Sequence, residues 1–328
     1  GSMALRSPFF PLGLVSASEA PVDWPRLAGG WRACAAVRIP EGLVAEAAQA
    51  LPRAFSRSRP AFAGLPMDRP HIMGILNVTP DSFSDGGDRS DLTAFIDHGR
   101  AMAAQGAAII DVGGESTRPD APAVDPEVEA ARVVPVVRAL AEAGLLVSID
   151  TRRASVMAAA LDAGARIVND VSALEDPAAL PLVASRQVPT ILMHMRGTPA
   201  TMRGYTVYED VLAEVYEALE KRIAACRQAG MGDELLCVDP GIGFAKNTTQ
   251  NLVMMRALAS FHGLGVPVLL GASRKRFIDE SVGAKERLAG SITAAAAAWE
   301  AGVQLIRVHD VAETAQARAL WQAINGVE

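Results

Sequence analysis

Residues 107–150 contain, in order, the runs AAIIDV (107–112), PEVEAARVVPVVRALAEA (126–143) and LLVSID (145–150). The first and third runs are short and almost continuously apolar, which is typical of strands buried on both faces of a parallel sheet. The middle run is rich in alanine and amphipathic, which predicts a helix. The segment therefore predicts a strand–helix–strand unit with parallel strands.

The same alternation recurs along the chain from His71 onward. The strand candidates are 71–77, 107–112, 145–150, 165–169, 188–194, 235–239, 266–270 and 303–309. The helical patterns that follow them are clearest at 91–105, 126–143, 152–163, 207–229 and 285–301. Several helices end at a glycine that suits a left-handed C-cap, namely Gly106, Gly144, Gly164, Gly230 and Gly302. Eight such units predict an α/β fold, the (β/α)8 TIM barrel, which needs about 250 residues.

A doubly wound parallel sheet is the alternative fold. It is disfavoured because eight units exceed its usual number of strands, and because GxGxxG does not follow the first strand.

The composition limits the class of protein. Of 328 residues, 50% are hydrophobic and 21% are charged, and the net charge is -6. These values exclude a disordered chain and argue against a broad face that binds nucleic acid. The longest apolar runs are far shorter than a bilayer span, so we expect no membrane partner. The cysteines, Cys34, Cys226 and Cys237, lack CxxC spacing and indicate a reducing compartment, so we expect a cytoplasmic protein.

The first 70 residues differ from the rest of the chain. They hold nine of the 20 prolines, and they predict an N-terminal extension (1–70) ahead of a barrel domain (71–328). Gly1 and Ser2 resemble the remnant of an expression tag. We expect the extension to pack on the barrel, and we assign no chemistry to it. A transit peptide is the alternative, which the acids at Glu19 and Asp23 disfavour.

Polar residues gather at the carboxyl ends of the predicted strands, where barrels keep their active sites. They are Asn77, Asp111, Asp150, Asn169, Asp170, His194, Asp239, Arg307 and His309. A single one of these groups could equally cap a strand or a helix. Because so many strands carry one, and a buried polar group needs a partner, a ligand site explains the set better.

Cations occupy two of these strand ends. Arg307 and His309 are two residues apart on one strand, so their side chains point the same way and could bind phosphate at the barrel mouth. The loop GASRKR (271–276) offers Ser273, Arg274 and Lys275 to an anion or a carbonyl. Loop 1 (78–87) and loop 2 (113–120) are punctuated by glycine, which suits mobile lids that exclude water.

Eight motifs at these strand ends resemble those of the dihydropteroate synthase family. They are GILNVTPDSFSDGG (74–87), DVGGESTRP (111–119), SIDT (148–151), NDVS (169–172), LMHMRG (192–197), DPGIGF (239–244), SRK (273–275) and RVHD (307–310). They occur in the order of that family, between about residues 71 and 315. The resemblance implies a TIM barrel, usually a homodimer, that acts in folate synthesis. It implies an enzyme that joins 6-hydroxymethyl-7,8-dihydropterin diphosphate to 4-aminobenzoate and releases pyrophosphate.

The resemblance also implies roles for individual residues. The pterin would contact Asp150, Asn169, Met193, Asp239, Phe244, Gly271 and Lys275. The diphosphate would contact Asn77, Thr117, Arg118, Arg307 and His309, and Asn77 would also bind Mg²⁺. The 4-aminobenzoate would contact Phe83, Thr117, Pro119, Phe244, Lys275 and Arg276. Asp150 and Lys275 would act in catalysis, with Asp85 as a proton acceptor for the amine.

The chemistry of the substrates is compatible with these roles. A carboxylate accepts the paired donors of a pterin's amino edge in a bidentate, charge-assisted manner. Loss of diphosphate would leave a carbocation at the pterin methylene, which Asp150 would stabilise while Mg²⁺, Arg307 and His309 neutralise the leaving group. The aromatic amine is already a neutral nucleophile, so the reaction needs no strong general base.

Arg276 departs from the family pattern, which often has a small hydroxyl residue there, close to the aminobenzoate carboxylate. Arg276 would either pair with that carboxylate or point away from it. Sulfonamides mimic 4-aminobenzoate, so sensitivity to these drugs depends on the same contact.

Two other functions are compatible with a pterin-binding barrel. A methyltransferase that passes a methyl group from methyltetrahydrofolate to a corrinoid shares the barrel and a similar pterin pocket. It does not need the anion-binding features of loop 1, SRK and RVH, all of which are present. A catalytically silent pterin-binding paralogue would show substitutions at Asn77, Asp150, Lys275, Arg307 or His309, and none is found at these positions.

Overall fold

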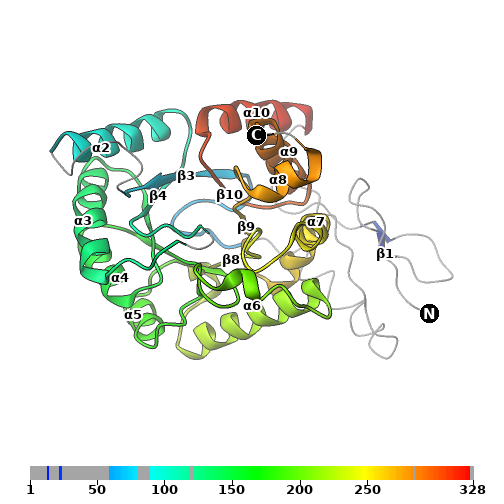
Figure 1. Cartoon of the computed structure of the whole chain (residues 1–328), viewed down its shortest axis with the longest axis horizontal. Coiled ribbons are helices and arrows are strands. Elements are labelled where there is room, and N and C mark those ends of the chain that lie inside the picture. The colour runs from blue at the N-terminus through cyan, green and yellow to red at the C-terminus, as the bar shows by residue number, and fades with distance from the viewer. Residues whose placement is uncertain are drawn as a thin grey trace.

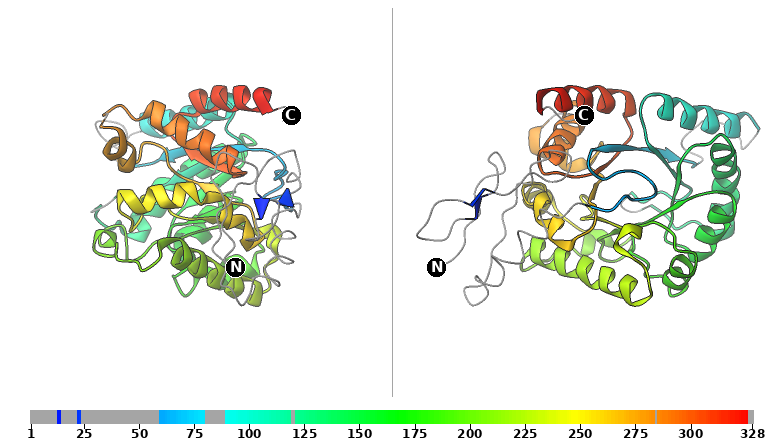
Figure 2. Two further views of the ribbon diagram at one scale, coloured as in Figure 1. Left: turned by 90° about the vertical axis from the view of Figure 1, so that its right-hand side faces the viewer. Right: turned by 180° about the vertical axis from the view of Figure 1, so that it is seen from behind.

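The computed structural model describes residues 59–79, 89–118, 121–283 and 285–325, and the short antiparallel pair β1 (Gly13–Leu14) and β2 (Val22–Asp23). Eight parallel strands lie at the centre and helices surround them, so the predicted TIM barrel is confirmed (Figure 1). The view from behind shows the same ring of helices around the strands (Figure 2).

All eight predicted strands are present. They are β3 (His71–Asn77), β4 (Ile109–Gly113), β5 (Val147–Asp150), β6 (Ile167–Asp170), β7 (Thr190–Met193), β8 (Leu236–Asp239), β9 (Leu269–Leu270) and β10 (Leu305–Val308). Their order in the sheet is β8-β7-β6-β5-β4-β3-β10-β9. A parallel bridge between Val238 of β8 and Val268, just before β9, joins the two ends of this sheet and closes the barrel.

The helices follow the strands as predicted. They are α2 (Arg89–Ala104), α3 (Pro126–Glu142), α4 (Ala154–Asp162), α5 (Ala179–Ser185), α6 (Val211–Gln228), α7 (Thr248–Arg256), α8 (Arg276–Val282), α9 (Leu288–Glu300) and α10 (Val311–Asn325). Short 3-10 helices lie at Met202–Gly204, Asp233–Leu235 and Leu258–Leu264. The five glycines predicted as left-handed caps all have positive φ angles, between 78° and 111°.

Three helices, α4, α6 and α9, begin two to four residues later than their patterns suggested, and α6 shows the largest difference. The predicted helix 207–229 starts at Val211, because the Asp210 side chain accepts hydrogen bonds from the backbone N–H groups of Leu212 and Ala213. This cap satisfies donors that the first turn of a helix leaves free, and it fixes the start of α6.

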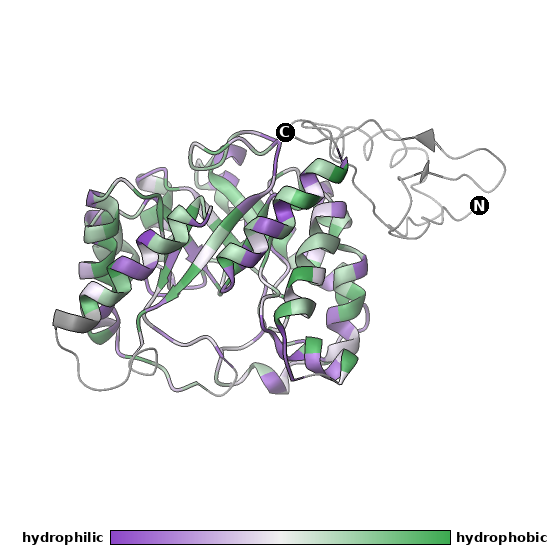
Figure 3. Cartoon of the chain, turned by 90° about the horizontal axis from the view of Figure 1, so that it is seen from above, coloured by the Kyte–Doolittle hydropathy of each residue, from purple (hydrophilic) through white to green (hydrophobic). Residues whose placement is uncertain are grey.

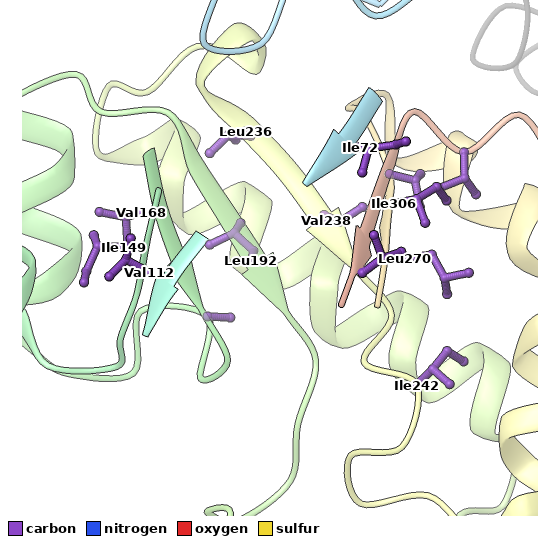
Figure 4. Close-up of a cluster of buried hydrophobic side chains, with 14 of the residues drawn as sticks. Ile72, Val112, Ile149, Val168, Leu192, Leu236, Val238, Ile242, Leu270 and Ile306 are labelled. Atoms are coloured by element: carbon purple, nitrogen blue, oxygen red, sulfur yellow. The ribbon is translucent and has the colours of Figure 1, made fainter. Parts of the chain in front are cut away.

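Side chains alternate along each strand between the barrel interior and the surrounding helices. The outward side chains join a large hydrophobic cluster with the helices, and Figure 4 shows members from successive strands, including Val112, Ile149 and Val168. Seen from above, the strands are mostly hydrophobic, whereas the helices carry both hydrophobic and hydrophilic residues (Figure 3). This pattern is that of a sheet buried on both faces and helices buried on one.

A separate apolar cluster fills the amino-terminal end of the barrel interior. Its buried members are Phe62, Met67, Met73, Ile109, Ile167, Ile191, Cys237, Leu269 and Leu305. Phe62 and Met67 precede β3, and the backbone of Phe62 bridges to that of Leu65. The Arg59 guanidinium donates to the His262 carbonyl oxygen at 2.6 Å. Residues 59–70 therefore close this end of the barrel.

We expect Phe62→Ala to lower the free energy of unfolding by about 3–5 kcal/mol, the usual cost of truncating a buried phenylalanine. Phe62 is fully buried in the closing segment. Urea unfolding measures the change, and Val207→Ala is the matched control because Val207 is 84% exposed. A loss below about 1 kcal/mol would show that the segment adds little to barrel stability.

Two expectations from composition concern the described residues. No helix in the described ranges is long and apolar enough to cross a membrane. Cys226 and Cys237 are buried free thiols, and burial raises the pKa of each above its ordinary value. Neither thiol therefore has the character of a nucleophile.

Candidate active site

The carboxyl ends of the strands bring most of the predicted polar residues together inside the barrel. The strand register places these side chains on the inner face, each from a different strand: Asn77, Asp111, Asp150, Asn169, Met193, Asp239 and Arg307. The side chain of Asn77 lies near Asp150, since a Cβ atom at Gly113 would be 3.5 Å from Asp150 Cβ and 3.7 Å from Asn77 Oδ1.

Two residues of the predicted rim, Asp170 and His194, do not face this site. Each directly follows an inward residue, so alternation turns it toward the helices. Asp170 accepts hydrogen bonds from the backbone N–H groups of Ser172 (2.7 Å) and Leu174 (2.8 Å), and it shapes the loop after β6. For Asp170 the capping interpretation is therefore correct, and the ligand interpretation is wrong.

Arg307 is the centre of the site. Its Nε atom donates to Asp111 Oδ2 at 2.6 Å and its Nη2 atom to Asp150 Oδ2 at 2.6 Å. Asn169 Nδ2 also donates to Asp111 Oδ2, at 3.0 Å. One guanidinium thus serves two carboxylates that are almost fully shielded from water. Asp111 was not among the residues assigned a role from the sequence, although it was recognised as a strand-end carboxylate.

The single guanidinium of Arg307 does not satisfy both carboxylates fully. Asp111 Oδ1 and Asp150 Oδ1 are buried and have no hydrogen-bond partner among the described residues. Burial raises the pKa of Asp150 to about 7, Arg307 opposes the rise, and the negative charge of Asp111 adds to it. A ligand with N–H donors would relieve this arrangement, because an unpaired buried acceptor is costly.

Asp239, Phe244 and Lys275 form a second side of the site. Asp239 Oδ1 accepts from the Gly241 N–H at 2.8 Å, while its Oδ2 atom would lie 3.7 Å from a Cβ atom at Gly271. The Lys275 ammonium lies 4.4 Å from the centre of the Phe244 ring and donates to the carbonyl of Ile242. Burial lowers the pKa of Lys275 to about 8, and Asp239 opposes this change.

His309 lies beside the loop that follows β9. Its Nδ1 atom is 3.1 Å from Ser273 Oγ, and its backbone N–H donates to the same hydroxyl at 3.2 Å. Burial lowers the pKa of His309 to about 4, and the charges of Arg307, Arg274 and Arg118 lower it further. The imidazole is therefore neutral near pH 7 and can donate or accept a hydrogen bond.

The three consecutive cations of the SRKR segment point in different directions. Lys275 faces the site, whereas Arg274, with a φ angle of 56°, pairs with Asp310 through its Nε atom at 2.9 Å. Arg276 begins α8 and pairs with Glu280 one turn later, with Nε to Oε1 at 2.7 Å and a side chain that is 64% exposed. The Arg276 side chain is thus not directed toward the predicted contact with the aminobenzoate, because helix geometry directs it to Glu280.

Loop 2 is anchored at its base. Glu115 accepts from Arg152 at 2.9 and 3.1 Å and from the Val124 N–H at 3.0 Å. Beyond this anchor Thr117 is partly buried and Arg118 is exposed. Phe83, Asp85 and Pro119, which were also predicted as site residues, lie outside the described residues.

One further buried charge, on Lys246, could not be anticipated from the sequence. Lys246 follows the DPGIGF motif and lies behind Phe244, where its ammonium contacts His194 Nδ1 at 3.0 Å. Neither spacing nor composition distinguishes this lysine from an exposed one, because its burial depends on the path of the loop from Asp239 to Lys246.

Comparisons with known proteins agree with the geometry. The family described as "Pterin binding enzyme" matches residues 73–309. A dihydropteroate synthase of Escherichia coli K12 is 46% identical over 262 residues, which cover 79% of this chain and 93% of the relative. The solved structure of Xanthomonas albilineans dihydropteroate synthase with 4-aminobenzoic acid is 46% identical, has a TM-score of 0.77, and the match covers 83% of this chain and 99% of that one.

A Yersinia pestis dihydropteroate synthase, solved in complex with a sulfonamide drug, is 40% identical. The match covers 80% of this chain and 97% of that one, with a TM-score of 0.75. The family match, the identities and the barrel-mouth residues lead to one conclusion. The chain belongs to the dihydropteroate synthase family of pterin-binding enzymes.

Proposed function

We propose that this chain joins 6-hydroxymethyl-7,8-dihydropterin diphosphate to 4-aminobenzoate and releases pyrophosphate, which is the reaction of its family. One observation carries the proposal. The Arg307 guanidinium lies between two buried carboxylates, each of which keeps an oxygen without a hydrogen-bond partner among the described residues. A pterin supplies N–H donors for such oxygens, and a diphosphate supplies negative charge for the guanidinium.

The pterin ring would bind against the inner face of the strands. Its amino and ring N–H donors would reach Asp150 and Asp239, and Asn169 would complete this hydrogen-bonding edge. Lys275 would turn from the Ile242 carbonyl to the carbonyl side of the pterin. Met193 and Phe244 belong to one small apolar cluster at this level of the barrel, which suits the flat faces of the ring.

The diphosphate would bind at Arg307 and His309, with Arg118 approaching from loop 2. Mg²⁺ would bind through the amide oxygen of Asn77 together with phosphate oxygens of the substrate. The donor set suits this arrangement, because an amide oxygen and phosphate oxygens are the hard oxygen ligands that Mg²⁺ prefers. When bound, a hard cation of this kind neutralises charge on the diphosphate.

The substitution would proceed by dissociation. The bond between the pterin methylene carbon and the diphosphate oxygen breaks, and the electron pair leaves with the diphosphate. Asp150 stabilises the positive charge that spreads from the methylene into the ring. The amine nitrogen of 4-aminobenzoate then forms the new C–N bond and loses a proton, for which Asp85 is the proposed acceptor.

The 4-aminobenzoate would bind between the two loops and the Phe244 side of the site. Phe83, Thr117 and Pro119 are the proposed loop contacts, and Lys275 would approach the same pocket. Because the related Yersinia pestis enzyme was solved with a sulfonamide drug, we propose that sulfonamides compete with 4-aminobenzoate here also. The pairing of Arg276 with Glu280 supports a pocket in which Arg276 is not needed for this competition.

The test is pyrophosphate release by the purified chain with both substrates, with and without Mg²⁺. We expect release that requires 4-aminobenzoate and falls when the metal is chelated. If calorimetry shows tight binding of the pterin diphosphate but no pyrophosphate is released, the proposed enzymatic activity is contradicted. The catalytically silent pterin-binding paralogue would then be the better interpretation.

We also propose that the protein is a homodimer. Leu320 and Ile324 lie one turn apart on α10 and are 63% and 74% exposed, which is unusual for large apolar side chains. Light scattering should give about twice the chain mass of 34.4 kDa. Leu320→Asp should lower that mass toward a single chain if α10 lies in the interface, while a monomeric wild-type protein would contradict the proposal.

A further inference from the structure

A buried lysine lies directly behind the pterin site. Lys246 is only 7% exposed, and its ammonium contacts the Gly241 carbonyl at 3.0 Å, the Phe244 carbonyl at 3.1 Å and His194 Nδ1 at 3.0 Å. All three acceptors are uncharged. Burial lowers the pKa of His194 to about 2, so the imidazole stays neutral and can accept through Nδ1.

The loop that this ammonium holds is tightly confined. Gly241 has a φ angle of 69°, and a Cβ atom there would lie 2.0 Å from the His194 carbonyl oxygen. Gly243 has a φ angle of 82°, and a Cβ atom there would lie 2.9 Å from Lys275 Cδ. The backbone from Asp239 to Lys246 therefore runs between the end of β7 and the lysine that faces the substrate.

Both ends of this loop carry groups of the proposed pterin site. Asp239 lies at its start and Phe244 near its end, and the Phe244 N–H donates to the Gly241 carbonyl at 3.1 Å. The Lys246 ammonium binds the carbonyls of the same two residues, 241 and 244. The ammonium thus holds these two carbonyl groups close together on the inner side of the turn, as a bound metal cation would.

We propose that Lys246, with His194 as its acceptor, is a positioning residue that sets the Asp239 carboxylate and the Phe244 ring for the pterin. This inference rests on the proposed function, because it names a residue that acts through the pterin site. Lys246 does not touch the substrate. Its removal should therefore weaken binding of the pterin most, because Asp239 contacts the pterin alone. Binding of the aminobenzoate should be weakened less, through the shared Phe244 ring.

The free-energy cost of burying the Lys246 ammonium distinguishes a positioning role from simple filling of space. A buried ammonium is costly, and burial lowers the pKa of Lys246 to about 7 although Asp239 opposes the change. The charged groups around it are Asp239, Lys275 and Arg196. A methionine would fill the same space without this cost but would leave the two carbonyls of the turn without their donor.

The test compares Lys246→Met with the wild type in steady-state kinetics and in calorimetry with the pterin diphosphate. We expect KM and Kd for the pterin diphosphate to rise about tenfold or more, as loss of hydrogen bonds to a charged group implies. KM for 4-aminobenzoate should rise clearly less than KM for the pterin diphosphate, because only the Phe244 ring is shared by the two pockets. Lys221→Met is the matched control, because Lys221 is 77% exposed on α6.

A second pair of variants keeps the test decisive if Lys246→Met does not fold. His194→Asn retains an acceptor oxygen near the position of Nδ1, whereas His194→Leu removes it. The leucine variant should show the raised KM for the pterin, and the asparagine variant should recover most of the wild-type value. Equal values for the two variants would overturn the inference.

Other outcomes separate this inference from the proposed function. Absence of pyrophosphate release in the wild type would contradict the proposed function, and the ratio of Kd values would still test Lys246. An unchanged Kd in folded Lys246→Met, or an equal loss for both substrates, would overturn the positioning role.

Discussion

Replacement of Asp150 by asparagine is expected to lower kcat/KM for the pterin diphosphate by about 10²- to 10³-fold. The carboxylate is proposed to accept two pterin donors and to stabilise the developing cation. An amide keeps the shape but turns an N–H donor toward the donors of the substrate, and it leaves Arg307 with one carboxylate in place of two. Loss of one charge-assisted contact at a buried polar site, with the new mismatch, corresponds to about 3–4 kcal/mol.

The measurement is the initial rate of pyrophosphate release at subsaturating pterin diphosphate. Asp97→Asn is the matched control, since the Asp97 side chain is 67% exposed on α2, and it should leave the rate unchanged. The thermal unfolding temperatures of both variants show whether a lower rate comes from the lost contact with the substrate or from loss of the folded structure. A folded Asp150→Asn enzyme that retains more than about a tenth of the wild-type kcat/KM would show that Asp150 does not hold the pterin.

Much of the fold and the site could be predicted because they depend on local patterns. A strand such as 71–77 is apolar because both its faces are buried, and a polar residue such as Asn77 at its end breaks that run. In a barrel these ends all meet at one mouth, so the set of candidate residues follows from the strands alone. The five glycine caps follow from a local requirement for a positive φ angle.

The directions of individual side chains could not be predicted in the same way, because they depend on packing between residues that are far apart in the sequence. The strand predicted at 188–194 is observed at Thr190–Met193 with Met193 on the inner face, so alternation turns His194 toward Lys246 and away from the substrate. Arg276 is expected from the family resemblance to lie near the aminobenzoate carboxylate, but α8 begins at this residue and its side chain pairs with Glu280. The capping and packing partners of these residues lie far away in the sequence.

The mouth of the barrel also has two groups that titrate close to neutrality. Burial raises the pKa of Asp150 to about 7, and burial lowers the pKa of Lys275 to about 8. The proposed roles require Asp150 as a carboxylate and Lys275 as an ammonium. His309 does not titrate in this range, because burial and the charge of Arg307 hold its pKa at about 4.

We therefore expect a bell-shaped dependence of kcat/KM for the pterin diphosphate, with an optimum between pH 7 and 8. Below the pKa of Asp150 the carboxyl gains a proton, so kcat/KM should fall about tenfold per pH unit as the pH decreases. Above the pKa of Lys275 the amine loses its proton, so kcat/KM should fall similarly as the pH increases. Asp150→Asn should remove the acid limb and Lys275→Met the alkaline limb, each at a lower overall rate. A limb that persists in both variants must come from the substrate or from Lys246, whose pKa burial lowers to about 7. Two such limbs would mean that neither Asp150 nor Lys275 controls binding of the pterin.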